Sequence, residues 1–261
     1  MQQVPLSTKP SILQLAIVFA LTAGMLALFR ALPELDMFVS RLAFSSTACE
    51  PGTVSKICGD FLLQNNKTFI ALRKFNLNMI NFFAMAAIGL VLFQLFFTSR
   101  TTGDDLRKSA LVIGTLILAT GVLVNLVLKN SWGRPRPFKV DQLGGDLPFV
   151  LPGTFSSYCD TNCSFVSGEA SSAAWLLTFL LFIPGLWRWV AGLVLMANMI
   201  FFSGLRVAFG RHFLSDVVMS VLFTLCVFMA LQALFSHPKF QVLFEKLARW
   251  SNQLAFVRRR K

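Results

Sequence analysis

The chain has 261 residues, of which 55% are hydrophobic and only 14% are charged. Soluble domains carry about 25% charged residues, so this composition argues against an ordinary soluble protein. The formal net charge is +12. The Lys and Arg residues lie between apolar blocks and in the tail, with no soluble basic domain to present them, so the charge does not indicate nucleic-acid binding.

Apolar blocks without Asp, Glu, Lys or Arg follow one another along the chain, at 11–29, 75–99, 109–128, 170–187, 189–205 and 217–236. Each is near the length of about 20 residues that a helix needs to cross the bilayer core. Backbone groups in lipid must bond internally, which favours helices. We therefore predict an all-α fold, a polytopic membrane helix bundle with six transmembrane helices, as a single domain over 1–261.

The first block contains small residues, Thr22-Ala23-Gly24, that loosely resemble a signal-peptide cleavage site. The apolar run continues past them to Phe29, which is long for the apolar region of a signal peptide. We expect a retained helix.

Basic residues predict the orientation, because short loops rich in Lys and Arg tend to stay in the cytoplasm. Such residues occur in the loop after the second block, in the loop after the fourth, and in the tail: Arg100, Arg107, Lys108, Arg188 and 258–261. All fall on one side of a six-helix path. We therefore place both termini in the cytoplasm and the segments 31–74, 129–169 and 206–216 outside.

Two regions outside the blocks have amphipathic patterns. In the first outward segment, 35–44 and 60–74 mix apolar and charged residues, so each is either a short interfacial helix or irregular loop. In the tail 238–261, apolar residues recur at three- and four-residue spacing with basic residues opposite. We predict an amphipathic helix on the cytoplasmic surface.

Four of the five cysteines lie in the outward segments, Cys49 with Cys58 and Cys159 with Cys163. Two close pairs on the outer face indicate a disulfide-permissive compartment. Four cysteines allow three connectivities, of which local pairing is the simplest. A zinc site is less favoured because no histidine lies near them.

The second outward segment opens with a basic cluster. Lys129, Arg134 and Arg136 lie within eight residues, and Pro135 and Pro137 restrict the backbone between and after them. A rigid basic loop at the membrane boundary suits an anion such as phosphate, although cations at a helix end can also simply anchor the chain.

Two further polar clusters precede later apolar blocks. Ser167 and Gly168 stand where a helix start offers free N–H groups to an anion, with Glu169 beside them; plain helix capping is the alternative. Arg206 precedes His212 and Asp216, which are four residues apart and share a helix face. A carboxylate there can orient an imidazole, or the pair can be a polar helix start.

All three clusters fall on the predicted outer face. We infer one anionic ligand, held by Lys129, Arg136 and Arg206, with His212 and Glu169 available for chemistry.

These residues resemble the three signatures of the type 2 phosphatidic acid phosphatase superfamily. The first signature, Lys, six residues, Arg-Pro, matches Lys129 to Pro137. The third matches Arg206, His212 and Asp216 in spacing, although Leu205 replaces a Ser. The second, Pro-Ser-Gly-His, is met only by Ser167 and Gly168, because Val166 and Glu169 replace the Pro and the His. The signature region covers 129–216.

The resemblance implies a metal-independent phosphatase without a cofactor. His212 would attack phosphorus and form a phosphohistidine, with Asp216 behind it. The phosphoryl oxygens would be held by Lys129, Arg136, Ser167, Gly168 and Arg206. Glu169 would take over proton transfer from the missing histidine, because a partly buried carboxyl can act as a general acid.

The run from Cys159 to Glu169 resembles a bacterial branch of the family that includes lipid A phosphatases. We predict a multi-pass protein of the bacterial inner membrane that removes phosphate from a lipid, with lipid A as the favoured candidate, at a periplasmic site. Undecaprenyl diphosphate and phosphatidylglycerophosphate are alternative substrates. A catalytically inactive phospholipid-binding or transport protein is the alternative of another class. The sequence predicts no oligomeric state.

Overall fold

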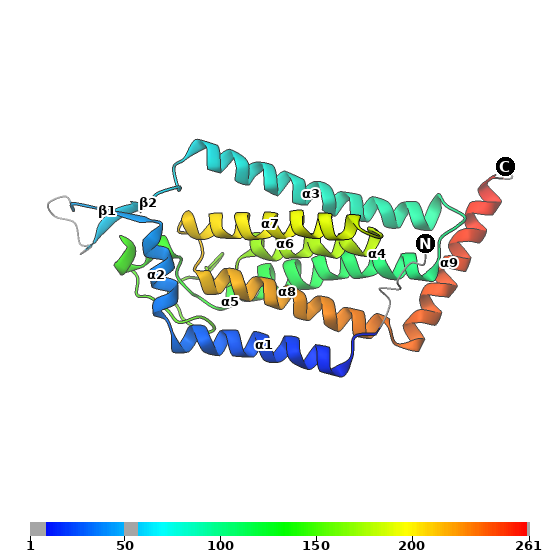
Figure 1. The fold of residues 1–261 in the computed structure, drawn as a ribbon, viewed down its shortest axis with the longest axis horizontal. Helices are drawn as coiled ribbons and strands as arrows, with labels where there is room; N and C mark the ends of the chain where they lie inside the picture. The colour runs from blue at the N-terminus through cyan, green and yellow to red at the C-terminus, as the bar shows by residue number, and fades with distance from the viewer. Residues whose placement is uncertain (1–8, 50–56, 260–261) are drawn as a thin grey trace.

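The structure is a computed structural model that describes residues 9–49 and 57–259. Figure 1 shows long helices lying side by side, with α2 and a small hairpin at one end and α9 across the other. The elements are α1 (Ile12–Ala31), α2 (Glu34–Leu42), β1 (Phe44–Thr47), β2 (Cys58–Phe61), α3 (Lys67–Phe96), α4 (Gly103–Thr115), η1 (Leu116–Leu128), α5 (Lys129–Ser131), η2 (Pro137–Lys139), η3 (Asp141–Leu143), α6 (Gly168–Leu176), η4 (Leu177–Phe182), α7 (Trp187–Ala208), α8 (Leu214–Phe235) and α9 (Pro238–Arg259).

The helical membrane fold predicted from the sequence is confirmed, but the count of six spans is not. Within the described residues, five helical stretches are long and apolar enough to cross a membrane: Ile12–Ala31, Lys67–Phe96, Gly103–Ser131, Trp187–Ala208 and Leu214–Phe235. The fourth apolar block, 170–187, forms the shorter apolar helix Gly168–Phe182. Ile183 after it is extended, and Pro184 follows, which cannot continue a helix.

This short helix, formed by α6 and η4, lies among the others. Ala170, Ala173 and Trp175 are fully buried, and α6 packs against α7, α8 and η1. The Trp175 Nε1 donates to the carbonyl of Val112 at 2.8 Å. A helix that is surrounded by protein does not have to match the thickness of the lipid, which explains how it can be short.

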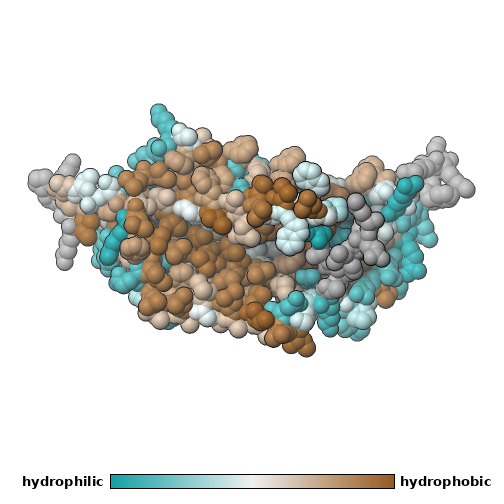
Figure 2. All heavy atoms as spheres, in the orientation of Figure 1, coloured by the Kyte–Doolittle hydropathy of each residue, from teal (hydrophilic) through white to brown (hydrophobic). Residues whose placement is uncertain are grey.

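The surface has the polarity of a membrane protein. Figure 2 shows hydrophobic residues over the middle of the bundle and hydrophilic residues toward its two ends. At most 39% of any spanning window is buried in the protein, so the remaining apolar side chains face outward. A soluble monomer rarely exposes so large an apolar surface.

Local sequence explains where several helices begin. Ser11 and Gln14 form a capping box at α1, as do Thr102 and Asp105 at α4. Asn66 caps α3 through its side chain, which accepts hydrogen bonds from the next turn.

The predictions for 31–74 are half right. The helix α2 lies inside 35–44 apart from its first residue, but 60–74 is not a separate amphipathic helix. It contains the end of β2, a turn and the first two turns of α3, which continues to Phe96. One reason is that β2 pairs antiparallel with β1, and this pairing holds Asp60 and Phe61 extended, opposite Ser45 and Phe44.

The predicted amphipathic tail forms α9. Its Phe244 and Ala248 pack with Leu106 of α4, while Leu243 and Trp250 stay exposed. In Figure 1, α9 and the start of α1 lie at the same end of the bundle, opposite α2 and the hairpin. The first and last described helices, α1 at its start and α9, therefore share one end of the molecule.

The structure pairs the cysteines locally. Cys49 is bonded to Cys58 and Cys159 to Cys163, with Cα–Cα distances of 5.1 and 5.7 Å. The first bond joins Cys49, just after β1, to the start of β2, and the second closes a small loop before α6. Cys226 is free and buried in α8.

Candidate active site

The structure brings the predicted site residues together at the end of the bundle that carries α2. Lys129 follows η1, Ser167 to Glu169 begin α6, Arg206 lies in the last turn of α7, and Asp216 lies in the first turn of α8. His212 lies in the short connection between α7 and α8. Three separate parts of the chain thus converge on one place.

His212 is held as a neutral imidazole with one free nitrogen. Its side chain is only 2% exposed, and Nδ1 lies 2.8 Å from the carbonyl oxygen of Ser164. A carbonyl can only accept, so Nδ1 donates and the lone pair is on Nε2. Burial lowers the pKa of His212 well below its ordinary value, and the cations of Arg206, Arg136 and Lys129 lower it further.

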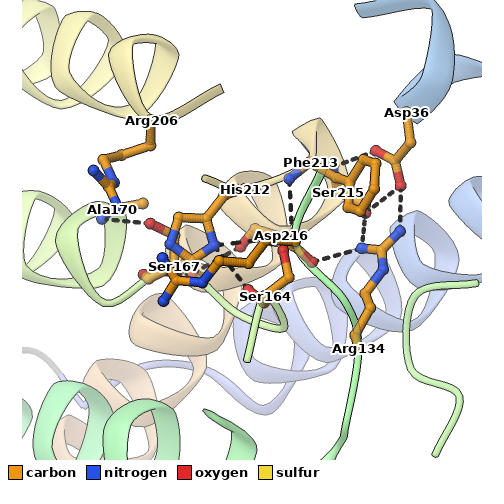
Figure 3. A network of polar contacts seen from close by, with 12 residues as sticks. Asp36, Arg134, Ser164, Ser167, Ala170, Arg206, His212, Phe213, Ser215 and Asp216 are labelled. Atoms are coloured by element: carbon orange, nitrogen blue, oxygen red, sulfur yellow. Dashed lines mark hydrogen bonds and ion pairs between the residues drawn. The ribbon is translucent and has the colours of Figure 1, made fainter. Parts of the chain in front are cut away.

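Asp216 supports His212 through Ser164 rather than by a direct hydrogen bond. The predicted partners, Nδ1 of His212 and Oδ2 of Asp216, are 3.9 Å apart, which is too long for a hydrogen bond. Instead, Oδ2 accepts from Ser164 Oγ at 2.5 Å and from the Phe213 N–H at 2.9 Å. Figure 3 shows this relay from Asp216 by way of Ser164 to the imidazole.

Arg134 is a buried residue that holds parts of the site together, a role that the sequence did not predict. Its guanidinium donates to Asp216 Oδ1 at 2.5 Å and to Asp36 Oδ2 at 2.8 Å. All three side chains are fully buried, and Ser215 bonds to both Arg134 and Asp36. Arg134 therefore ties α2 to the first turn of α8 (Figure 3). It stood out in the basic cluster, whereas nothing in the sequence singled out Asp36.

Arg136 is held by the loop that the second disulfide closes. Its Nε and Nη2 donate to the Asn162 carbonyl at 3.1 and 2.7 Å, and Nη2 also donates to Asn162 Oδ1 at 2.7 Å. Burial lowers the pKa of Arg136, and the nearby Arg211 cation lowers it further. A cation whose charge is poorly compensated is suited to bind an anion.

The start of α6 allows both an anion and the Lys129 ammonium to come close to its backbone. Ser167 caps the helix, its Oγ accepting from the Ala170 N–H at 3.4 Å. A Cβ on Gly168 would lie 2.6 Å from Asn125 Oδ1 and 2.9 Å from Lys129 Nζ. Only glycine therefore lets the Lys129 ammonium lie against the helix start, where N–H groups favour phosphate.

Glu169 is paired with two arginines. Its Oε1 accepts from Arg73 Nη2 at 2.7 Å and Nε at 3.1 Å, and Oε2 accepts from the same Nε at 3.1 Å. Oε1 also lies 3.2 Å from Arg206 Nε. Arg73, which comes from α3, is a second residue that the sequence reasoning missed, because it lies outside every motif and 96 positions from Glu169.

Within residues 9–49 and 57–259, no group of three or more His, Cys, Asp or Glu side chains could hold a metal ion. The positive charges around His212 in this part of the chain come from Lys and Arg.

Comparison with known proteins agrees with this geometry. The PAP2 superfamily matches residues 109–238, a range that contains nearly all of the site. A lipid A 4′-phosphatase of Rhizobium leguminosarum is 37% identical over 227 residues, which cover 86% of this chain and 97% of that protein. A lipid A 4′-phosphatase of Rhizobium etli is 38% identical over 221 residues, covering 84% of this chain and 86% of that protein.

A lipid A 4′-phosphatase of Francisella tularensis subsp. novicida is 39% identical over 121 residues, covering 45% of this chain and 54% of that protein. No solved structure matches the chain. Together, the superfamily match and the two long alignments show that this chain belongs to the PAP2 superfamily.

Proposed function

We propose that this protein removes a phosphate monoester from lipid A and that the reaction passes through a phosphohistidine on His212. Phosphatase activity on lipid phosphates follows from the family and its relatives. The choice of lipid A rests on the names of those relatives. The observation that carries the mechanism is the buried imidazole, with Nδ1 bound to Ser164 and Nε2 free, beside three cationic side chains.

In the first step, the Nε2 lone pair forms a bond to phosphorus while the bond from phosphorus to the lipid oxygen breaks. The lipid oxygen leaves with the electron pair and takes up a proton. Lys129, Arg136 and Arg206 bind the non-bridging oxygens and stabilise their charge, as positioned cations do in phosphoryl transfer. The Nδ1–H bond to Ser164 supports the positive charge that develops on the ring.

In the second step, water attacks phosphorus, the P–N bond breaks, and its electron pair returns to Nε2. The water gives up one proton, and inorganic phosphate leaves. Glu169 is the carboxylate proposed for both proton transfers. Because its two oxygens already accept hydrogen bonds from Arg73, it can donate a proton to the leaving group only if this pair opens.

We propose that the reaction needs no metal ion, since cationic side chains can supply the charge stabilisation that a metal ion provides elsewhere. The test uses purified protein, lipid A and EDTA. Phosphate release is measured together with the mass of the lipid product. Activity should survive EDTA and fall at least about a thousandfold in His212→Ala.

A rapid-quench experiment with radiolabelled lipid A tests the intermediate. We expect label on the wild-type protein that is lost in acid and kept in base, as is typical of a phosphoramidate, and no label on His212→Ala. Full activity of the variant would exclude His212 as nucleophile. Turnover of undecaprenyl diphosphate or phosphatidylglycerophosphate in place of lipid A would reassign the substrate. No turnover of any of them by folded protein would favour a binding protein.

We also propose that the chain is one domain of the bacterial inner membrane, with the site in the periplasm and both termini in the cytoplasm. Three features support this. The site and the start of α1 lie at opposite ends of the bundle, both disulfides lie outside the spanning helices toward the site, and the short basic loops lie at the other end.

A further inference from the structure

The side chain of Arg73 extends from α3 into the site, and its contact with Glu169 leaves some of its N–H donors without a partner among the described residues. Its hydrogen bonds to the carboxylate come from Nε and Nη2. A guanidinium has five N–H donors, and the Arg73 side chain remains 33% exposed. Part of the guanidinium can therefore bind a ligand while Glu169 holds the rest.

A second polar side chain of α3, Asn76, lies where this helix packs against its neighbours. Asn76 is three residues further along α3, so it shares the helix face of Arg73, which packs toward α6 and α7. It is fully buried, and neither Nδ2 nor Oδ1 has a hydrogen-bond partner within the described part of the chain. Buried amides are nearly always satisfied, so a pair of free polar atoms here indicates a missing partner.

Helix α7, which also packs against α3, has a similar feature. Ser203 lies three residues before Arg206 on α7, is 5% exposed, and its Oγ also lacks a partner among the described residues. Unsatisfied polar groups thus lie one helical turn deeper than Arg73 on α3 and one turn deeper than Arg206 on α7.

The charges exceed what one phosphate requires. Four cations gather around a single carboxylate, Glu169: Lys129, Arg136, Arg206 and Arg73. The remaining net charge of about three positive is larger than the charge of about two negative on a phosphate monoester. The single charge of Arg134 is shared by Asp216 and Asp36, which leaves one negative charge, and the nearby Arg211 cation offsets it.

We propose that Arg73 and Asn76 form a second headgroup subsite, which binds an anionic group of the lipid other than the phosphate that His212 attacks. The proposal rests on the phosphatase function proposed above. It implies that the preferred substrate is a lipid with two anionic groups on its headgroup, such as a bisphosphorylated lipid A.

The test compares kcat/KM for bisphosphorylated lipid A with that for the monophosphorylated form that keeps only the scissile phosphate. Wild-type protein should prefer the bisphosphorylated lipid, mainly through KM. Arg73→Gln should reduce this preference about tenfold or more, since a hydrogen-bonded charge is removed. Arg73→Lys should keep part of it, because the charge remains but the planar fork is lost.

Lys74→Gln is the matched control, because Lys74 is the next cation of the same helix and is exposed. It should leave the preference unchanged. Asn76→Leu should lower the preference while the unfolding temperature stays near that of the wild type, because the side chain has no protein partner to lose. A change in unfolding temperature with the preference intact would make Asn76 purely structural and overturn its part in the subsite.

Two results overturn the proposal while leaving the phosphatase function intact. One is an active wild-type protein without preference for the bisphosphorylated lipid. The other is an equal loss on both lipids in Arg73→Gln, which would limit Arg73 to supporting Glu169. If the wild-type protein turns over neither lipid, the proposed function itself fails.

Discussion

At the scale of single residues, the site depends on which nitrogen of His212 is free. The carbonyl of Ser164 binds Nδ1 at 2.8 Å, and this leaves the lone pair on Nε2. Burial and those cations keep the ring neutral when an exposed histidine would begin to take up a proton. A neutral ring is what a nucleophile requires.

We predict that the acidic limb of the kcat/KM profile lies below about pH 6.5, the ordinary histidine value, because the pKa of His212 is lowered. Arg136→Gln removes one of the responsible cations and should move this limb to higher pH. Arg41→Gln, an exposed arginine of α2, should not move it. A wild-type limb at the ordinary value would contradict the buried neutral imidazole.

The same pKa shift predicts a loss of stability in acid. The unfolded chain binds a proton at His212 more readily than the folded chain, so the free energy of unfolding should fall as pH decreases below about 6.5. Thermal unfolding in detergent across this range measures it. In His212→Asn the dependence should flatten.

Glu169 offers a test of the proton-transfer hypothesis. If Glu169 transfers protons, Glu169→Gln should lower kcat about a hundredfold or more, and Glu169→His should restore part of the rate. If the side chain only holds Arg73 and Arg206, the Gln variant should raise KM and leave kcat near the wild-type value. Steady-state kinetics separate the two outcomes.

At the scale of elements, two loops carry the site, and each is fixed by contacts with other parts of the chain. Arg134 joins the loop after η1 to α2 and to α8 through two buried carboxylates. The disulfide loop before α6 holds Arg136 through Asn162. The helices set the positions of these loops, and the polar contacts set the directions of the side chains.

Replacing Arg134 by Met should destabilise the protein by about 3–5 kcal/mol, since it leaves two carboxylates buried without a partner. The measurement is reversible unfolding in mixed micelles. Arg30→Met, which removes hydrogen bonds to Pro152 and Thr154 but no ion pair, is the control and should cost less. Equal stability of the two variants would refute the structural role of Arg134.

Removing the second disulfide, with Cys159→Ser and Cys163→Ser together, should raise KM about tenfold, because Asn162 no longer holds Arg136 in place. Removing the hairpin disulfide, with Cys49→Ser and Cys58→Ser, should leave KM unchanged. Equal effects of both double variants would mean that the disulfides act only on overall stability.

At the scale of the whole molecule, the apolar middle and polar ends of the surface (Figure 2) support the proposal that the site lies at a membrane boundary. There, a lipid can keep its acyl chains in the bilayer while its phosphate meets the cations. The start of α1 and α9 lie at the far end of the bundle, so an impermeant reagent should reach one end and not the other.

Single cysteines test this orientation. Ser157 near the site and Lys246 on α9 are both exposed. With the outer membrane permeabilised, an impermeant maleimide should label Ser157→Cys in intact spheroplasts, and Lys246→Cys only after lysis. The reverse pattern would invert the proposed topology.

The sequence by itself determined the helical membrane fold, the convergence of three motifs and most of the side chains of the candidate site. The apolar composition of a segment indicates whether it lies in lipid or in water. The spacing between residues indicates local backbone structure, as at the capping boxes of α1 and α4. Both kinds of information are short-range.

Only the tertiary structure decided which side chains meet. It showed the shortened central helix, the relay through Ser164 and the pairing of Arg73 with Glu169, 96 positions away. Likewise, Asp36 meets Arg134 across 98 positions. Such partners are chosen by the packing of whole helices, which depends on all of the side chains at once and leaves no periodic signal in the chain.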